Sequence, residues 1–347
     1  MRQKGPLIAA LLREMEIQRN YLEGEPIESI YFGGGTPSLL PAEDIRALIL
    51  CLRDLFTIEP DAEFTLEANP DDITEEKLNA WKASGINRLS IGIQSFFDED
   101  LRWMNRAHTA GEAMVNLQLA IKHFNNITID LIYGTPQLTN EKWKKNVDTA
   151  IALGIPHLSC YALTVEPKTP LDKMIRQFKR EDVNPDKQSE QFLLLMQWME
   201  EAGYEHYEIS NFARPGRRSR HNSSYWQGKK YLGLGPSAHS FNGKERQWNV
   251  SNNNIYITSL EKGQLPFEKE VLTPTQQLNE YIMTSLRTME GLNLVTLRSV
   301  FGIREDEMLG KTKPFSAGGL LKQADHSLVL TKEGKLLADG IAAALFF

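Results

Sequence analysis

Residues 29–37, SIYFGGGTP, constrain the fold more than any other part of this sequence. Ile30, Tyr31 and Phe32 are β-branched or aromatic residues that suit a buried strand. Three consecutive glycines then remove every Cβ where that strand should end, so the backbone can come close to a ligand there. The pattern predicts a strand that runs into a tight loop, which is either a binding loop or a plain turn before a helix.

The same strand-and-helix unit recurs along the first half of the chain. Further strands are predicted at residues 64–70, 88–95, 127–136 and 157–163. Strands that alternate with helices predict a parallel sheet with right-handed crossovers. Each strand carries polar residues or glycines at or near its carboxyl end, which is typical of a (β/α) barrel, whereas an open doubly wound sheet binds ligand at one switch point. GGGTP also lacks the G-x-G-x-x-G spacing of a dinucleotide-binding turn.

The remaining segments predict an incomplete barrel followed by a second domain. Apolar residues at helical spacing open the chain, where a parallel α/β domain normally begins with a strand. We expect one more strand at 204–210 and a run of loops and short strands over 213–241. Residues 1–270 are therefore predicted to form a partial barrel, and 271–347 a helical, winged-helix-like domain whose two-strand wing turns near Glu333 and Gly334. No Lys/Arg stripe marks a recognition helix, so we expect no nucleic-acid role.

Composition limits the compartment and the partners. The net charge of −6 gives no general attraction to nucleic acid or anionic membrane. The two cysteines, Cys51 and Cys160, each lie in an apolar run far from the other, as expected of buried thiols in a reducing compartment. No apolar run approaches transmembrane length, and we expect a cytoplasmic protein without an integral membrane segment.

Six motifs occur in a specific order along the chain. They are GGGTP, EANP, GIQS followed by Arg106, DLIYG, HNSSYW and GLGPSAHS. Each is weak alone, but the ordered set resembles the HemN/HemW branch of the radical S-adenosylmethionine (SAM) proteins over nearly the whole chain. The resemblance implies a TIM-like α/β barrel that binds SAM and a [4Fe–4S] cluster, and a function in haem or porphyrin metabolism.

The cluster motif of that family is not found in this sequence. By resemblance, the first barrel strand leads into a C-x-x-x-C-x-x-C loop whose three thiolates hold the cluster. Cys51 and Cys160 do not supply such a set. We therefore expect a chain that starts late, without the first strand and the cluster loop, and that performs no radical chemistry as given.

The resemblance also implies a SAM site at the carboxyl ends of the strands. The implied residues are Gly34, Gly35, Thr36, Glu67, Gln94, Arg106, Asp130 and Ala162. Open backbone and a hydroxyl suit an ammonium group, and a carboxylate at a strand tip suits a cationic centre or ribose hydroxyls. The guanidinium fork of Arg106 suits a carboxylate. Glu67 and Arg106 also fit the alternative of ordinary salt bridges.

The H-N-x-x-Y-W element, with His221, Tyr225 and Trp226, resembles the segment that distinguishes haem chaperones from coproporphyrinogen oxidases. Imidazole is a common axial ligand of haem, and the nearby arginines, Arg217, Arg218 and Arg220, suit propionates. The alternative is a loop histidine fixed by hydrogen bonds. We expect a haem chaperone that binds haem and passes it to an acceptor protein. Two alternatives remain open, an oxygen-independent coproporphyrinogen III oxidase and a binding scaffold without chemistry.

Overall fold

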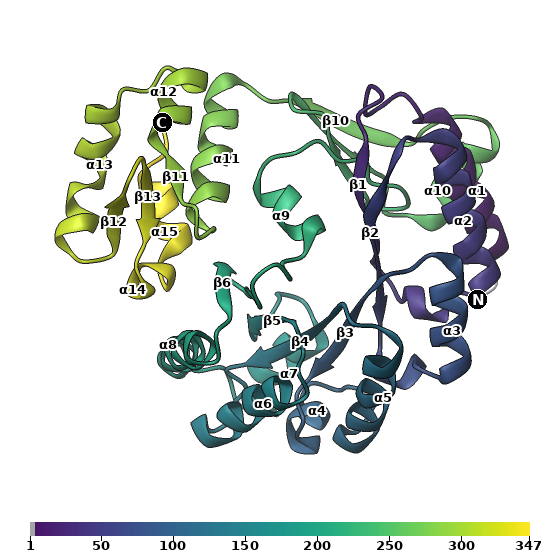
Figure 1. Cartoon of the computed structure of the whole chain (residues 1–347), viewed down its shortest axis with the longest axis horizontal. Coiled ribbons are helices and arrows are strands. Elements are labelled where there is room, and N and C mark those ends of the chain that lie inside the picture. Colours follow the sequence, from purple (N-terminus) through teal and green to yellow (C-terminus); the bar gives the residue numbers. More distant parts are fainter. Residues whose placement is uncertain (1–3) are drawn as a thin grey trace.

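A curved, seven-stranded mixed sheet forms the main body of the computed structural model, which describes residues 4–347 (Figure 1). The strand order is β1-β2-β3-β4-β5-β7-β6, and the first five strands are parallel. Their bounds are β1 Ile27–Phe32, β2 Ile58–Ala68, β3 Arg88–Gln94, β4 Ile127–Tyr133, β5 His157–Ala162, β6 Glu205–Glu208 and β7 Asn211–Ala213. The predicted partial α/β barrel is confirmed.

Helices follow the parallel strands and cover the outer face of the sheet (Figure 1). The helices that pack on this face are α2 Ala42–Leu55, α3 Glu75–Ser84, α5 Ala110–His123, α6 Asn140–Ala152 and α8 Pro185–Glu201. The shorter helices α4 Asp98–Trp103 and α7 Pro170–Arg176 follow β3 and β5, and 3-10 turns lie at Pro37–Leu39 and Pro70–Asp72. Their ends follow local chemistry. The Thr74 hydroxyl accepts from the Lys77 N–H at the start of α3, and Gly85 ends that helix with φ 103°, which a glycine adopts without strain.

The inner face of the sheet is polar, which is unusual for parallel strands. Strands buried on both faces are normally apolar throughout. Here buried apolar residues such as Leu66, Ile91 and Ile129 pack on the helices, and the residues between them point the other way. The inner-face residues are Ser29, Tyr31, Glu63, Thr65, Glu67, Arg88, Ser90, Thr128, Asp130, His157 and Ser159. This alternation leaves a polar interior suited to holding a ligand.

Residues 204–210 do not form the single strand that was expected. They contribute β6 and the turn into β7, and β7 pairs antiparallel with β5. The chain reverses because the Ser210 carbonyl accepts from the Cys160 N–H (2.7 Å), while the Glu208 carboxylate accepts from the Ser210 N–H (3.0 Å). The parallel sheet therefore ends in an antiparallel hairpin at one edge.

The segment after β7 is more ordered than the loops that the sequence predicts. It contains the helix α9 Arg220–Trp226, capped by Ser219, and a three-stranded antiparallel sheet of β8 His239–Phe241, β9 Glu245–Asn249 and β10 Phe267–Val271. Helix α10 Asn253–Glu261 packs on the opening helix α1 Lys4–Ile17. The buried Glu14 of α1 fixes this contact by accepting from the Tyr256 hydroxyl of α10 (2.5 Å). The same carboxylate accepts from Asn249 Nδ2 (2.6 Å) and from the Gly235 N–H (2.8 Å).

The C-terminal part has the element order of a winged helix. It runs α11 Pro274–Leu286, β11 Leu292–Asn293, α12 Leu294–Phe301, α13 Glu305–Ala317, β12 Leu321–Ala324, β13 Ser327–Leu330, α14 Lys332–Lys335 and α15 Ala338–Ala344. The wing turns at residues 325–326, so the expected turn near Glu333 and Gly334 is wrong. Both belong to α14, where a Cβ on Gly334 would lie 1.8 Å from the Leu320 carbonyl oxygen. Between residues 4 and 347, no helix is long and apolar enough to cross a membrane.

Candidate functional site

The glycine loop after β1 is fastened to β2 through Glu67. Glu67 Oε1 accepts from the Tyr31 hydroxyl (2.7 Å), and Oε2 accepts from the Gly34 N–H (3.2 Å). Gly34 and Gly35 have φ values of 74° and 67°, which disfavour residues with a Cβ. A Cβ on Gly33 would lie 2.6 Å from Tyr31 Cε1 and 3.1 Å from Glu67 Oε1. The loop backbone therefore holds the Glu67 carboxylate in one place at the carboxyl edge of the sheet.

Asp130, in the middle of β4, makes this part of the interior favourable for a cation. Burial and, to a lesser degree, the charge of Glu67 raise the pKa of Asp130 to about 7, against the opposing effects of a hydrogen bond from Ser159 and the charges of Arg88 and Arg106. Burial and the neighbouring Glu67 also raise the pKa of the Tyr31 phenol. Two carboxyl groups that repel each other are relieved when a positive ligand binds between them.

Gln94 and Arg106 lie together at the end of β3. Gln94 adopts φ 66°, a left-handed conformation that is uncommon for a residue with a side chain. A Cβ on Gly92 would lie 2.8 Å from Gln94 Nε2 and 3.4 Å from Arg106 Nη2. Arg106 Nη2 also donates to Asn69 Oδ1 (3.1 Å), which fixes its guanidinium at the carboxyl end of β2. The structure thus brings an arginine fork and an amide to the edge that holds Glu67.

Thr36 and Ala162 are placed at the same edge by topology. Thr36 precedes the 3-10 turn at Pro37–Leu39 and makes no capping hydrogen bond with its side chain. Ala162 is the last residue of β5 and is partly buried against the main core. Their contacts with a ligand stay predictions.

His221 lies against the inner face of β1, next to Tyr31. Its Nδ1 is 3.2 Å from Ser29 Oγ, and its ring stacks on Tyr31 with centroids 4.8 Å apart and an interplanar angle of 22°. Burial lowers the pKa of His221, with Arg88 adding to this and Glu63 opposing it, so the imidazole is neutral at pH 7. Over the described chain, residues 4–347, no residue hydrogen-bonds to Nε2. The predicted haem ligand therefore adjoins the predicted SAM site.

The first turn of α9 rests on a buried carboxylate. Glu63 accepts from the Arg220 N–H (3.1 Å), the His221 N–H (3.2 Å) and the Ser219 hydroxyl (3.2 Å). Its own counterion is Arg88, 3.9 Å away and likewise buried. An acidic group at the amino end of a helix satisfies N–H groups that lack a partner within it. Glu63 therefore sets the position of His221.

The aromatic residues of α9 differ in how freely they can meet a ligand. Tyr225 is 51% exposed and lies perpendicular to Trp226, with ring centroids 5.5 Å apart. The Arg287 guanidinium lies 5.0 Å from the centroid of the Trp226 ring and covers one face of it. Arg218 pairs with two glutamates and Arg220 with Asp61, whereas Arg217 is exposed. Tyr225 and Arg217 are exposed, and so is Arg220, although its guanidinium is paired with Asp61.

Sequence reasoning gave no role to four residues that build the site, Ser29, Tyr31, Glu63 and Arg88. A signal was present for two of them. Arg88 is the one charged residue of the strand RLSIGIQ, and Glu63 directly precedes the strand residues FTL. Charged residues at such positions are buried only when they are paired or functional. The partner of Ser29 lies 192 positions away, and nothing local points to it.

The thiols of this chain do not fit a three-thiolate cluster. Cys51 is on α2, and Cys160 faces the apolar core from β5. Burial raises the pKa of both thiols, which disfavours the thiolate that binds iron. Across residues 4–347, no group of three His, Cys, Asp or Glu side chains is arranged to hold a metal ion.

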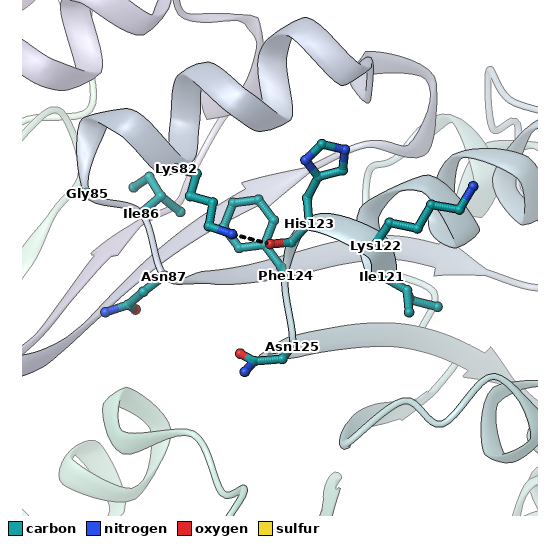
Figure 2. A pocket seen from close by; sticks show the side chains of 9 residues that line it. All are labelled: Lys82, Gly85, Ile86, Asn87, Ile121, Lys122, His123, Phe124 and Asn125. Atoms are coloured by element: carbon teal, nitrogen blue, oxygen red, sulfur yellow. Dashed lines mark hydrogen bonds between the residues drawn. The ribbon is translucent and has the colours of Figure 1, made fainter.

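One surface hollow lies at the other end of the sheet (Figure 2). It is lined by residues 85–87 and 121–125, which precede β3 and β4, and by Lys82, whose Nζ donates to the His123 carbonyl (3.0 Å). It is thus separated from Glu67 and Gln94 by the length of the strands. We assign no ligand to this hollow.

Comparison with known proteins gives two family models and several similar chains. The Radical SAM superfamily model matches residues 9–150, and the HemN C-terminal domain model matches residues 272–337. A heme chaperone HemW from Mycobacterium tuberculosis H37Rv is 35% identical over 97% of this chain and 85% of its own length. For Bacillus subtilis HemW these values are 32%, 92% and 86%. The solved structure of Escherichia coli coproporphyrinogen III oxidase (HemN) has a TM-score of 0.83 and 24% identity over 98% of this chain and 82% of that one, which shows a shared fold.

Proposed function

This chain belongs to the HemW family of radical SAM proteins, and from this we propose that it binds haem and passes it to an acceptor protein. The observation that carries the proposal is the environment of His221. Its Nδ1 meets the Ser29 hydroxyl, while Nε2 has no hydrogen-bond partner in the described chain. Histidines that bind metals commonly donate their other ring N–H to an oxygen, which fixes the tautomer and the ring.

The residues around His221 suit haem as the cargo. The lowered pKa keeps the imidazole neutral, so the Nε2 lone pair is available to the iron. The exposed Tyr225 offers an aromatic face to a porphyrin, and Trp226 lies beside it under Arg287. Arg217 is exposed and available to a propionate.

The adjoining polar edge suits SAM. The carboxyl groups of Glu67 and Asp130 favour the positive charges of its sulfonium and ammonium groups. The open backbone of Gly34 and Gly35 and the Thr36 hydroxyl accept hydrogen bonds from the ammonium. Arg106 pairs with the carboxylate of SAM. Gln94 and Ala162 complete the proposed lining. In this proposal residues 1–270 form the binding domain and residues 271–347 form a supporting domain. The protein works in the cytoplasm, because free thiols are typical of a reducing compartment.

The alternative, an oxygen-independent coproporphyrinogen III oxidase, converts propionates to vinyls by radical chemistry. That chemistry needs an iron–sulfur cluster, and the thiols present here do not fit one. We therefore expect this chain to leave coproporphyrinogen III unchanged under anaerobic reducing conditions. Turnover by the 347-residue chain would favour the oxidase instead.

Haem titration tests the proposal. Hemin is added to the wild type, to His221→Ala and to His239→Ala, which removes an exposed histidine on β8 and serves as the matched control. We expect a shifted Soret band in the wild type and in His239→Ala, and loss of that shift or a tenfold or greater rise in Kd in His221→Ala. Identical spectra for the wild type and His221→Ala would remove the assigned ligand.

A further inference from the structure

The inner face of β1 connects the two proposed sites. Ser29, Tyr31 and Gly33 alternate along this face, and each contacts a different part of the interior. We propose that Tyr31 is a positioning residue that couples haem binding at His221 to SAM binding at Glu67, so that each ligand tightens the other. This inference rests on the proposed function and adds a relation between its two ligands.

The first link joins His221 to Tyr31. The two rings are stacked at 4.8 Å, and the imidazole is held from its edge by Ser29 and from its backbone by Glu63. The ring therefore has little freedom except against Tyr31. An iron bound at Nε2 would further restrict the orientation of the imidazole. The Tyr31 ring, which stacks on the face of that imidazole, would then be restricted as well.

The second link joins Tyr31 to the glycine loop. The phenol donates its single proton to Glu67 Oε1 (2.7 Å), and the other oxygen of the same carboxylate accepts from the Gly34 N–H (3.2 Å). There is little free space here, since a Cβ on Gly33 would overlap Tyr31 Cε1 (2.6 Å) and lie close to Glu67 Oε1 (3.1 Å). A change in the tilt of the phenol thus moves the carboxylate and the backbone N–H bound to it.

The sign of the coupling follows from preorganisation. Haem that fixes the His221 ring also fixes Tyr31 and Glu67. SAM then binds to a carboxylate that has already lost its mobility, so its binding costs less conformational entropy. Coupling of binding free energies is reciprocal, so SAM must tighten haem by the factor with which haem tightens SAM. We expect a factor of roughly five or more, the lower end of the range for such couplings.

The experiment measures haem affinity of the 347-residue chain from the Soret band, without SAM and with saturating SAM, in three proteins. The wild type should bind haem at least fivefold more tightly with SAM. Tyr31→Phe keeps the stacked ring and loses the hydroxyl that bonds to Glu67, so the factor should fall to about one. Tyr281→Phe, which loses a hydroxyl in the C-terminal domain, should behave as the wild type.

Each outcome decides the inference. A factor of one in the wild type overturns the coupling and leaves haem binding standing, and the wild-type measurement needs no variant to fold. An unchanged factor in Tyr31→Phe shows that the hydroxyl is not the link. Failure of the wild type to bind haem at all overturns the coupling together with the proposed function.

Discussion

Glu63 should be the most costly single position to alter in the interior of the barrel. Its carboxylate is 5% exposed, accepts from three groups at the start of α9 at distances of 3.1–3.2 Å, and lies 3.9 Å from the guanidinium of Arg88, which is 2% exposed. Glu63→Ala removes the acceptor of α9 and the counterion of Arg88 in one step. The two losses have different magnitudes and can be separated.

The larger loss concerns Arg88. Removing one partner of a buried ion pair costs about 3–5 kcal/mol, and two unit charges 4 Å apart attract by about 4 kcal/mol at an effective dielectric constant of 20. Arg88 keeps neutral acceptors in Asn126 (2.6 Å) and Thr128, which favours the lower end, about 3 kcal/mol. Loss of the cap of α9 adds about 1 kcal/mol. We therefore expect Glu63→Ala to lower the free energy of unfolding by about 4 kcal/mol.

Urea unfolding and hydrogen exchange measure these effects. Through local opening of α9, backbone amides of residues 222–226 should exchange about fivefold faster in Glu63→Ala, which corresponds to the loss of about 1 kcal/mol expected for the cap. The double variant Glu63→Gln/Arg88→Met removes both charges and should lose at least 1 kcal/mol less than the sum of its single variants. A cost below about 1 kcal/mol for Glu63→Ala, with unchanged exchange in α9, would refute the role given to this carboxylate.

Three further predictions concern other parts of the molecule. The raised pKa of Asp130 means that the folded state keeps a proton that the unfolded state loses between about pH 4 and 7, so this group lowers stability as pH rises through that window. Urea unfolding of Asp130→Asn should therefore show a gain of about 2–4 kcal/mol relative to the wild type at pH 7.5 and little difference at pH 4; equal gains would contradict the assignment. Arg287→Ala removes the ion partner (3.2 Å) of the buried Glu208 and should lower the urea-unfolding free energy by about 2–3 kcal/mol, and a loss under 0.5 kcal/mol would show that the pair is unimportant. Gly33→Ala places a Cβ 2.6 Å from an aromatic carbon of β1 and should cost about 1–3 kcal/mol in the same assay, whereas Gly111→Ala, with open space around it in α5, should cost nothing.

Local signals were sufficient to predict the parallel half of the fold. Strand and helix alternated clearly up to residue 165, and helix limits such as Thr74 and Gly85 followed capping rules that depend on a few neighbouring residues. Glu67 and Gln94 were recognised as polar ends of predicted strands and Asp130 as a polar residue inside one, and the resemblance to the radical SAM family then implied their role in binding SAM. Glu67 and Asp130 are close enough to shift a pKa, as the prediction of a common site requires.

Features that depend on distant partners were missed or misplaced. Helix α9 forms because Ser219 and the distant Glu63 satisfy its first turn, and a seven-residue helix has too few turns to show a period. The β6/β7 hairpin depends on bonds from Ser210 to β5. The wing turn was assigned to Glu333 and Gly334 because glycine suggests a turn, whereas Gly334 is required by the approach of the Leu320 carbonyl.

The position of β6 has a consequence for solubility. It is the last strand of the seven-stranded sheet, and the C-terminal part attaches to its outer edge. There the Met289 N–H donates to the Tyr207 carbonyl (3.0 Å), and Glu208 forms a β-bridge with Thr288. A free rim of this kind is a template on which another polypeptide can add a strand. The winged-helix-like part therefore covers the edge of β6 and blocks the addition of another strand. A chain cut after residue 272 should self-associate through the exposed edge of β6.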